Sequence, residues 1–138
     1  MYNQLINFLN LHNILYLKQF GFCNNHSTAL ALNDLINNIS SAIKRNETTL
    51  GIFLDLSKAF DTINHEILCQ KLQRYGIRDT ALAWIKNYLE DQTQLVQFGS
   101  HRSYRWKILC GVPQGLILGP LLFIIYINDL PNVSSLTQ

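Results

Sequence analysis

The sequence predicts an α+β fold, because segments with helical periodicity and segments of strand length are mixed along it without strict alternation. Three observations support this prediction: an amphipathic pattern from Ala29 to Ile43, a short apolar run at Thr49–Asp55, and two strand-like segments at residues 94–98 and 104–109. At 138 residues and 48% hydrophobic content, the chain is expected to form a single domain, residues 1–138.

Four helices are predicted from apolar spacing and from residues that start or stop helices. Ser27 is a candidate N-cap for the first, which carries apolar residues through Ile43. The second covers residues 67–75 and ends at Gly76, and the third opens at Asp79 or Thr80 and runs to Leu89. The fourth begins near Pro120 and continues as "LLFIIYIND", which is apolar on nearly every face and is therefore expected to be buried.

The strand predictions rest on length and turn residues. "TLGIFLD", Thr49–Asp55, is interpreted as a buried strand because it is too short for a helix. "QLVQF" and "YRWKIL" flank the turn sequence "GSHRS", which predicts a hairpin.

Composition excludes several classes of protein. Cys23, Cys69 and Cys110 lie far apart, which favours neither a zinc site nor a secreted disulfide framework. The longest apolar stretch, Leu116–Ile127, is interrupted by Gly119-Pro120 and is shorter than the about 20 residues that cross a bilayer. With no pattern of a signal peptide, the sequence predicts an intracellular protein, cytoplasmic or nuclear, without a membrane partner.

Charge is unevenly distributed. The net charge is +2, yet residues 71–107 hold seven basic and three acidic side chains. Aromatic residues Tyr88, Tyr104 and Trp106 lie among them. This pattern is compatible with binding to a nucleic-acid backbone, although a solvated charged surface also explains it.

Asp55 ends the apolar run, and a residue at this position has three possible roles: a turn cap, a calcium ligand or a catalytic metal ligand. In "DLSKAFDTINHE" it takes the first position of an EF-hand loop. The calcium role fails, because Ala59 has no side-chain oxygen at the fifth position and Phe60 replaces the glycine required at the sixth.

"FLDLSKAFDTINHEIL" closely resembles the motif "FLDLSKAFDTV" in reverse transcriptases of non-LTR, LINE-type retrotransposons. Other segments resemble landmarks of that family in the same order, covering roughly residues 19 to 131: "QFGFCNNHSTALAL", "KLQRYGI", "AWIKNYL" and "GVPQGLILGPLLFIIYINDLP". The resemblance implies the palm of a reverse transcriptase with part of the fingers.

The resemblance also implies a set of site residues. Asp55 would be the catalytic carboxylate and a ligand of Mg²⁺, with the Leu56 carbonyl as a second metal contact. Phe60, Gln114 and Gly115 would contact the incoming nucleotide, although Phe60 is equally explained as a core residue. Asp61 is expected to cap the following helix. The basic side chains expected to bind nucleic acid are Arg102, Arg105 and Lys107.

The sequence departs from the family pattern in ways that lower the expected activity. No Asp-Asp pair occurs in the 138 residues, so the chain is expected to stop before the catalytic hairpin that carries this pair. By the resemblance, Cys23 and Gln92 stand where arginine is usual, and Leu116 where serine is usual. Because one carboxylate cannot organise two metals, the chain alone is expected to be inactive.

The sequence thus predicts a fragment of an RNA-directed DNA polymerase. RNA template, DNA primer and deoxynucleotides are its expected partners in the intact family, with no obligate protein partner. The alternative is a non-enzymatic, residual nucleic-acid-binding fold from a decayed element. Without the acid-bearing hairpin, the helix after Pro120 is expected to be uncovered and the protein loosely packed or prone to aggregate.

Overall fold

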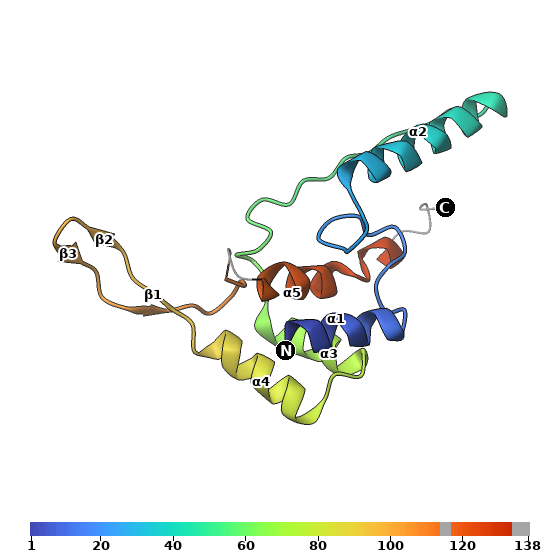
Figure 1. The fold of residues 1–138 in the computed structure, drawn as a ribbon. Coiled ribbons are helices and arrows are strands. Elements are labelled where there is room, and N and C mark those ends of the chain that lie inside the picture. Colours follow the sequence, from blue (N-terminus) through green and yellow to red (C-terminus); the bar gives the residue numbers. More distant parts are fainter. Residues whose placement is uncertain (114–116, 134–138) are drawn as a thin grey trace. The chain divides into compact units, whose positions relative to one another are not determined.

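The computed structural model describes residues 1–113 and 117–133, and these divide into two compact units, Met1–Leu15 with Lys58–Gln138 and Tyr16–Ser57. Helices and short strands occur together (Figure 1), so the predicted α+β class is confirmed. Within the described residues, no helix is long and apolar enough to cross a membrane.

The first unit, here called the helical unit, is built around a core of aliphatic side chains. Its elements are α1 (Tyr2–Leu11), α3 (His65–Arg74), α4 (Asp79–Glu90) and α5 (Leu118–Ile127). α3 packs against both α4 and α5. The core includes Leu9, Leu68, Leu72, Ile85 and Leu122, all fully or almost fully buried. A 3-10 helix at Leu130–Val133 follows α5.

Helix α5 is buried in this unit, as its continuous apolar sequence predicts, and not uncovered as expected from the missing acid-bearing hairpin. Leu121, Leu122, Ile124 and Ile125 are each at most 2% exposed. The expectation of an uncovered helix was wrong because α1 and α3 supply apolar side chains to the same core. Pro120 falls in the first turn of α5 instead of at its first residue, a position where the missing N–H has no intrahelical partner in any case.

The end of α5 is tied to the rest of the helical unit by polar contacts. Lys71 on α3 donates from Nζ to the Asp129 carboxylate and to the Tyr126 carbonyl. Asn128 Nδ2 donates to the Ile14 carbonyl at 2.8 Å and to the Tyr75 hydroxyl at 3.2 Å. The "IND" sequence therefore anchors the end of the buried helix to α3 and to the segment after α1.

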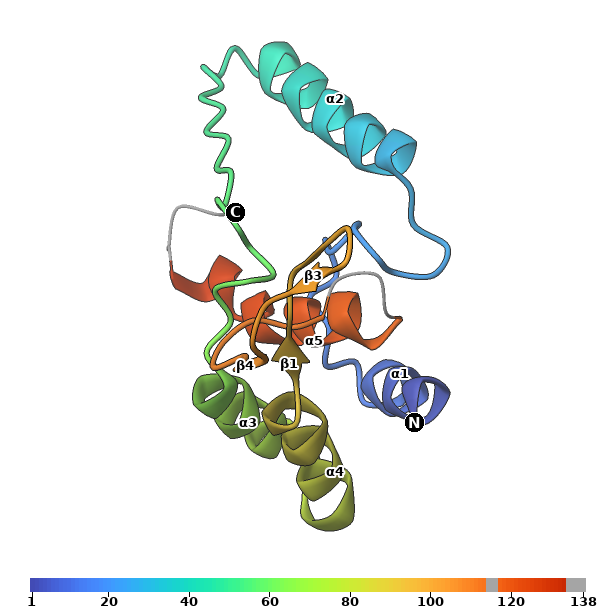
Figure 2. The ribbon, with the colours of Figure 1, turned by 90° about the vertical axis from the view of Figure 1, so that its left-hand side faces the viewer.

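The hairpin extends from the end of α4, away from the helices of its unit (Figure 1), and it is seen end-on in front of α5 when that side faces the viewer (Figure 2). β1 (Thr93–Gln94) pairs antiparallel with β4 (Trp106–Lys107), and β2 (Gln97–Phe98) pairs with β3 (His101–Arg102). Gly99 has a φ of +59° in the two-residue turn, where glycine adopts a left-handed conformation without strain. The predicted hairpin is present, but its turn is shorter than the predicted "GSHRS", because His101 and Arg102 pair with β2 and leave only Gly99 and Ser100 in the turn.

The second unit, Tyr16–Ser57, contains α2 (Thr28–Lys44), which buries none of its residues. The predicted cap is confirmed, because Ser27 Oγ accepts from the Leu30 amide at 3.2 Å. Two ion pairs lie in this unit, Lys18 with Asp34 and Arg45 with Glu47.

The predicted strand at Thr49–Asp55 is absent, since residues 47–56 adopt neither helix nor strand. Ile52, Phe53 and Leu54 are 75%, 84% and 84% exposed. A strand requires a partner strand for its backbone hydrogen bonds, and none of the strands in the described ranges pairs with this segment. The prediction of a buried strand was therefore wrong for this structure.

Candidate functional site

A backbone junction joins two segments that are far apart in the sequence. The Gly111 amide donates to the Ile63 carbonyl at 2.7 Å, and the Val112 amide donates to the Phe60 carbonyl at 2.8 Å. A turn precedes the junction, because the Asp61 amide donates to the Lys58 carbonyl at 2.9 Å. The "SKAFDTI" turn and the start of "GVPQG" are thus held side by side.

Gly111 makes this close approach possible. Its φ is +89°, and a Cβ there would lie 2.8 Å from the Asp61 Cα and 2.9 Å from the Phe60 carbonyl oxygen. Real Cβ atoms do not approach backbone that closely. Glycine is therefore required at this position both by conformation and by space.

The start of α3 completes the junction. His65 Nε2 donates to the Gly111 carbonyl at 2.6 Å, which fixes the proton on that ring nitrogen. Asn64 Oδ1 accepts from the amides of Glu66 and Ile67 at 2.9 and 3.1 Å. The helix cap is therefore Asn64, and the expectation that Asp61 caps the helix was wrong, because Asn64 is the residue immediately before the first helical turn.

Phe60 is half-buried at the edge of the helical core. Its ring centroid lies 4.7 Å from that of Phe123 on α5, with the planes tilted by 37°. This contact orients the ring beside the junction, and it agrees with the core role that the sequence left open for this residue.

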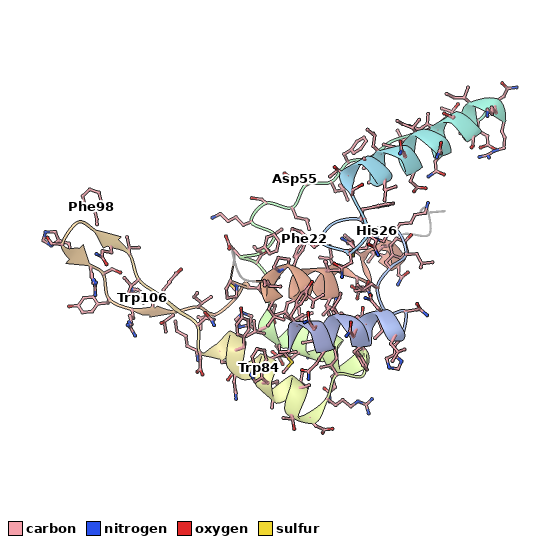
Figure 3. The ribbon with its side chains drawn as sticks, in the orientation of Figure 1. Phe22, His26, Asp55, Trp84, Phe98 and Trp106 are labelled. Carbon is pink, nitrogen blue, oxygen red and sulfur yellow. The ribbon has the colours of Figure 1, made fainter. Side chains whose placement is uncertain are left out.

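Asp55 and Leu56 lie in the other unit, on the exposed segment that follows α2 (Figure 3). One carboxylate and one main-chain carbonyl are too few donors for a two-metal site. In residues 1–113 and 117–133, no group of three or more His, Cys, Asp or Glu side chains could hold a metal ion. The described residues therefore do not form a complete metal centre.

Two predicted nucleotide-binding residues, Gln114 and Gly115, lie outside the described residues. Val112, two residues before Gln114, is buried and belongs to the core. The chain thus enters this segment from the junction that Gly111 and Val112 form with Ile63 and Phe60.

The predicted nucleic-acid-binding cations lie together on the hairpin. Arg102, Arg105 and Lys107 are all exposed. Arg102 Nε donates to Gln97 Oε1 across β2 and β3 at 3.0 Å, which holds that guanidinium over the ribbon. No acidic residue occurs anywhere between Gln92 and Cys110.

Sequence reasoning missed a polar cavity of about 650 Å³ beside the hairpin base, between α3 and α4. His65, Cys69, Lys86 and Lys107 are among its lining residues. Burial raises the pKa of the Cys69 thiol, while Lys86 lowers it and Glu90 raises it. The hydrophilic residues of the amphipathic helices α3 and α4 were the available signal, but only the packing of the two helices places them together.

The amino-acid sequence is similar to those of a protein family and of several known proteins. Residues 1–136 match the family described as reverse transcriptase (RNA-dependent DNA polymerase). An RNA-directed DNA polymerase from mobile element jockey of Drosophila melanogaster is 34% identical over 120 residues, which are 87% of this chain. A probable RNA-directed DNA polymerase from transposon BS of the same species is 33% identical over 135 residues, 94% of the chain.

A third relative is the retrovirus-related Pol polyprotein from type-1 retrotransposable element R2 of Popillia japonica. It is 36% identical over 93 residues, which are 67% of this chain. The matched regions are 13%, 14% and 13% of the lengths of these three relatives. No solved structure matches the chain significantly.

Proposed function

This chain belongs to the reverse transcriptase family of RNA-dependent DNA polymerases, and we propose that it is part of the polymerase domain of a non-LTR retrotransposon. In this proposal residues 1–138 form one partial domain that contributes the palm core and part of the fingers. The intact enzyme extends a DNA primer with deoxynucleotides on an RNA template. Support comes from relatives whose names specify RNA-directed DNA polymerases of mobile elements.

The observation that carries the proposal is the junction between the "SKAFDTI" turn and "GVPQG". The family resemblance assigns nucleotide contacts to both segments, and backbone hydrogen bonds hold them together at Gly111 and Val112. Residues separated widely in the sequence would thereby form two walls of one site. Phe60 would support the sugar of the incoming nucleotide, with Gln114 and Gly115 on the opposite wall.

Asp55 is proposed as one carboxylate ligand of a divalent metal, with the Leu56 carbonyl beside it. Reverse transcriptases generally use divalent metal ions, and Mg²⁺ is the ion that suits a sparse set of oxygen donors. Such ions neutralise charge that develops during in-line displacement at phosphorus. Because the described residues supply too few donors, the remaining carboxylates would have to come from elsewhere, and residues 1–138 alone are proposed to be inactive.

A competing hypothesis is a residual fold from a decayed element that binds nucleic acid without catalysis. It is favoured by the cations of the hairpin, because binding to phosphates requires no catalytic carboxylate. Both hypotheses assign Arg102, Arg105 and Lys107 to nucleic-acid phosphates. They differ in whether Asp55 retains a role when the missing parts are supplied.

The test is primer extension on an RNA template with a completed protein. The chain is joined to an Asp-Asp hairpin, thumb and finger segments from the family, and Cys23 is replaced by arginine. We expect extension with Mg²⁺ from the completed protein and none from residues 1–138 alone.

Asp55→Asn in the completed protein should then lower extension by orders of magnitude, because a neutral amide is a poor Mg²⁺ ligand. Asp61→Asn is the matched control and should retain most activity. Phe60→Ala should spare extension and admit ribonucleotides, because it removes bulk beneath the sugar. Wild-type extension by Asp55→Asn would refute the metal role, and unchanged sugar selection in Phe60→Ala would leave Phe60 a core residue only.

A further inference from the structure

A second cavity, of about 530 Å³, lies between the first turns of α1 and α4 in the helical unit. Both helices contribute side chains to the core, but α4 packs against α3 and not closely against α1, so space remains between them. None of the described residues that line this cavity belongs to the junction or to the polar cavity. Its volume is in the range of small-molecule sites.

The lining of this second cavity is largely apolar. Leu5, Ile77 and Ile85 line it and are each at most 5% exposed. Phe8 and Ala81 line it as well and are half-buried. A ligand with an apolar body would displace water from this surface and gain free energy by doing so.

Trp84 on α4 forms part of the same lining and is 42% exposed (Figure 3). Its ring stacks on that of Tyr88, with centroids 5.6 Å apart and planes at 6°. Tyr88 is not among the residues that line the second cavity. The stack therefore holds the indole in place and leaves another part of it to contact a ligand.

The charge at the second cavity is positive. Arg78 is the only charged side chain among the described residues that line it, and the neighbouring Asp79 does not line it. Arg78 is exposed, and in the described ranges it forms no ion pair. A guanidinium can bind a carboxylate through two parallel hydrogen bonds.

We propose that the second cavity binds a small amphipathic carboxylic acid. The apolar body of the acid contacts Leu5, Phe8 and Trp84, and its carboxylate pairs with Arg78. An amine would be repelled by the guanidinium, and an anion without an apolar body would leave the apolar lining in water. This inference does not depend on the polymerase function, because it uses none of the residues assigned to that function.

The experiment uses the full chain with Trp106→Phe, which leaves Trp84 as the only tryptophan. Octanoate is the probe, 1-octanol supplies the same apolar chain without the charge, and acetate supplies the carboxylate without the chain. We expect octanoate to bind saturably and to shift Trp84 emission to shorter wavelengths, because its chain displaces water from the indole. Acetate should cause no shift.

Variants separate the charge from the apolar lining. Arg78→Gln should weaken octanoate binding by about 3- to 10-fold and leave 1-octanol binding unchanged, with the loss limited by the solvent exposure of Arg78. The Arg78 side chain makes no cap hydrogen bond to α4, so this change should not unfold the helix. Lys86→Gln is the matched control, because Lys86 is on the same helix but lines the polar cavity.

A third variant tests the space itself. Ala81→Leu places a larger side chain in the lining and should weaken binding of octanoate and 1-octanol alike. Circular dichroism and thermal unfolding without ligand establish that each variant is folded. Because a ligand of the folded state raises its stability, octanoate should also raise the midpoint of thermal unfolding, and less so in Arg78→Gln.

Two results would overturn the inference. If millimolar octanoate produced neither saturable binding nor a change in Trp84 emission, the second cavity would not be a ligand site. If Arg78→Gln and Lys86→Gln weakened octanoate binding equally, or neither weakened it, the carboxylate would not be recognised by Arg78. Primer extension tests the polymerase function separately, so the two proposals can fail independently.

Discussion

Gly111 is a residue at which the chain tolerates little change. A side chain there would collide with the backbone of Phe60 and Asp61, and the φ of +89° is strained for any other residue. The backbone hydrogen bonds of the junction depend on this close approach.

We predict that Gly111→Ala lowers the free energy of unfolding by about 2 kcal/mol or more. Gly99→Ala is the control, because Gly99 also has a positive φ but has nothing within 4 Å of an added Cβ. That variant should lose only about 1 kcal/mol, from conformation alone. Equal losses in urea-induced unfolding of the two variants would show that the space at Gly111 is not limiting.

Asp129 supplies a pH-dependent contribution to stability. The hydrogen bond from Lys71 holds the pKa of this carboxyl below its ordinary value. A lowered folded-state pKa means that the folded protein favours the ionised form, so the contribution is present above the unfolded-state pKa of about 4. It is lost as the pH falls through the lower pKa of the folded state.

We therefore expect wild type to exceed Asp129→Asn in unfolding free energy at pH 7, and the difference to close as the pH falls below about 4. The Asp129 side chain is 49% exposed, so solvent limits the difference to about 1 kcal/mol or less. Denaturant titrations at a series of pH values measure it. A difference that stays constant down to pH 2 would contradict the role assigned to the Lys71 contact.

At the scale of single elements, the hairpin concentrates positive charge without any compensating acid. Charge reversal at Arg102, Arg105 and Lys107 should abolish nucleic-acid binding, since phosphate contacts release counterions and supply most non-specific affinity. Wild-type affinity should fall steeply as salt rises from about 50 to 200 mM. Fluorescence anisotropy checks both outcomes, and affinity retained at high salt or in the triple variant would assign binding to another surface.

The helices show how much of an element is encoded locally. α2, α3 and α4 follow apolar spacing of three and four residues, whereas α5 is marked by Pro120 and a continuous apolar run. Ser27 and Gly76 mark helix ends that the structure places close to the predicted ones. The cap of α3 could not be predicted as reliably, because Asp61 and Asn64 both carry acceptors and only the actual first helical residue decides between them.

Elements that depend on distant partners could not be predicted from their own residues. "TLGIFLD" has strand composition, but a strand forms only against another strand, and pairing is a property of the whole sheet. The junction of Phe60 with Val112 likewise carries no local pattern. The family resemblance brought these segments to one site, and side-chain spacing alone did not.

At the scale of the whole molecule, burial is divided unequally between the two units. The buried hydrophobic residues belong to the helical unit, whereas α2 in the Tyr16–Ser57 unit buries none. Leu32, Ile36 and Ile43 on α2 are 55%, 48% and 65% exposed. The two units should therefore differ in local stability.

Hydrogen exchange measures this difference. We expect amides of α2 to exchange at rates near those of an unfolded chain, because little apolar burial opposes opening of the helix. Amides in the middle of α3 and α5 should be protected to the level of global unfolding. Equal protection in α2 and α3 would show that α2 is stabilised by contacts beyond its own unit.

The junction at Gly111 also sets an order of events during folding. Its hydrogen bonds close a loop of roughly 50 residues. Closing such a loop loses conformational entropy, and this loss opposes folding until the bonds have formed. The contacts between α3 and α4 are far more local and can form first. In the transition state for folding, the α3–α4 pair should therefore be formed and the junction not yet formed. A substitution that strains the backbone at Gly111 should then raise the unfolding rate and leave the refolding rate unchanged.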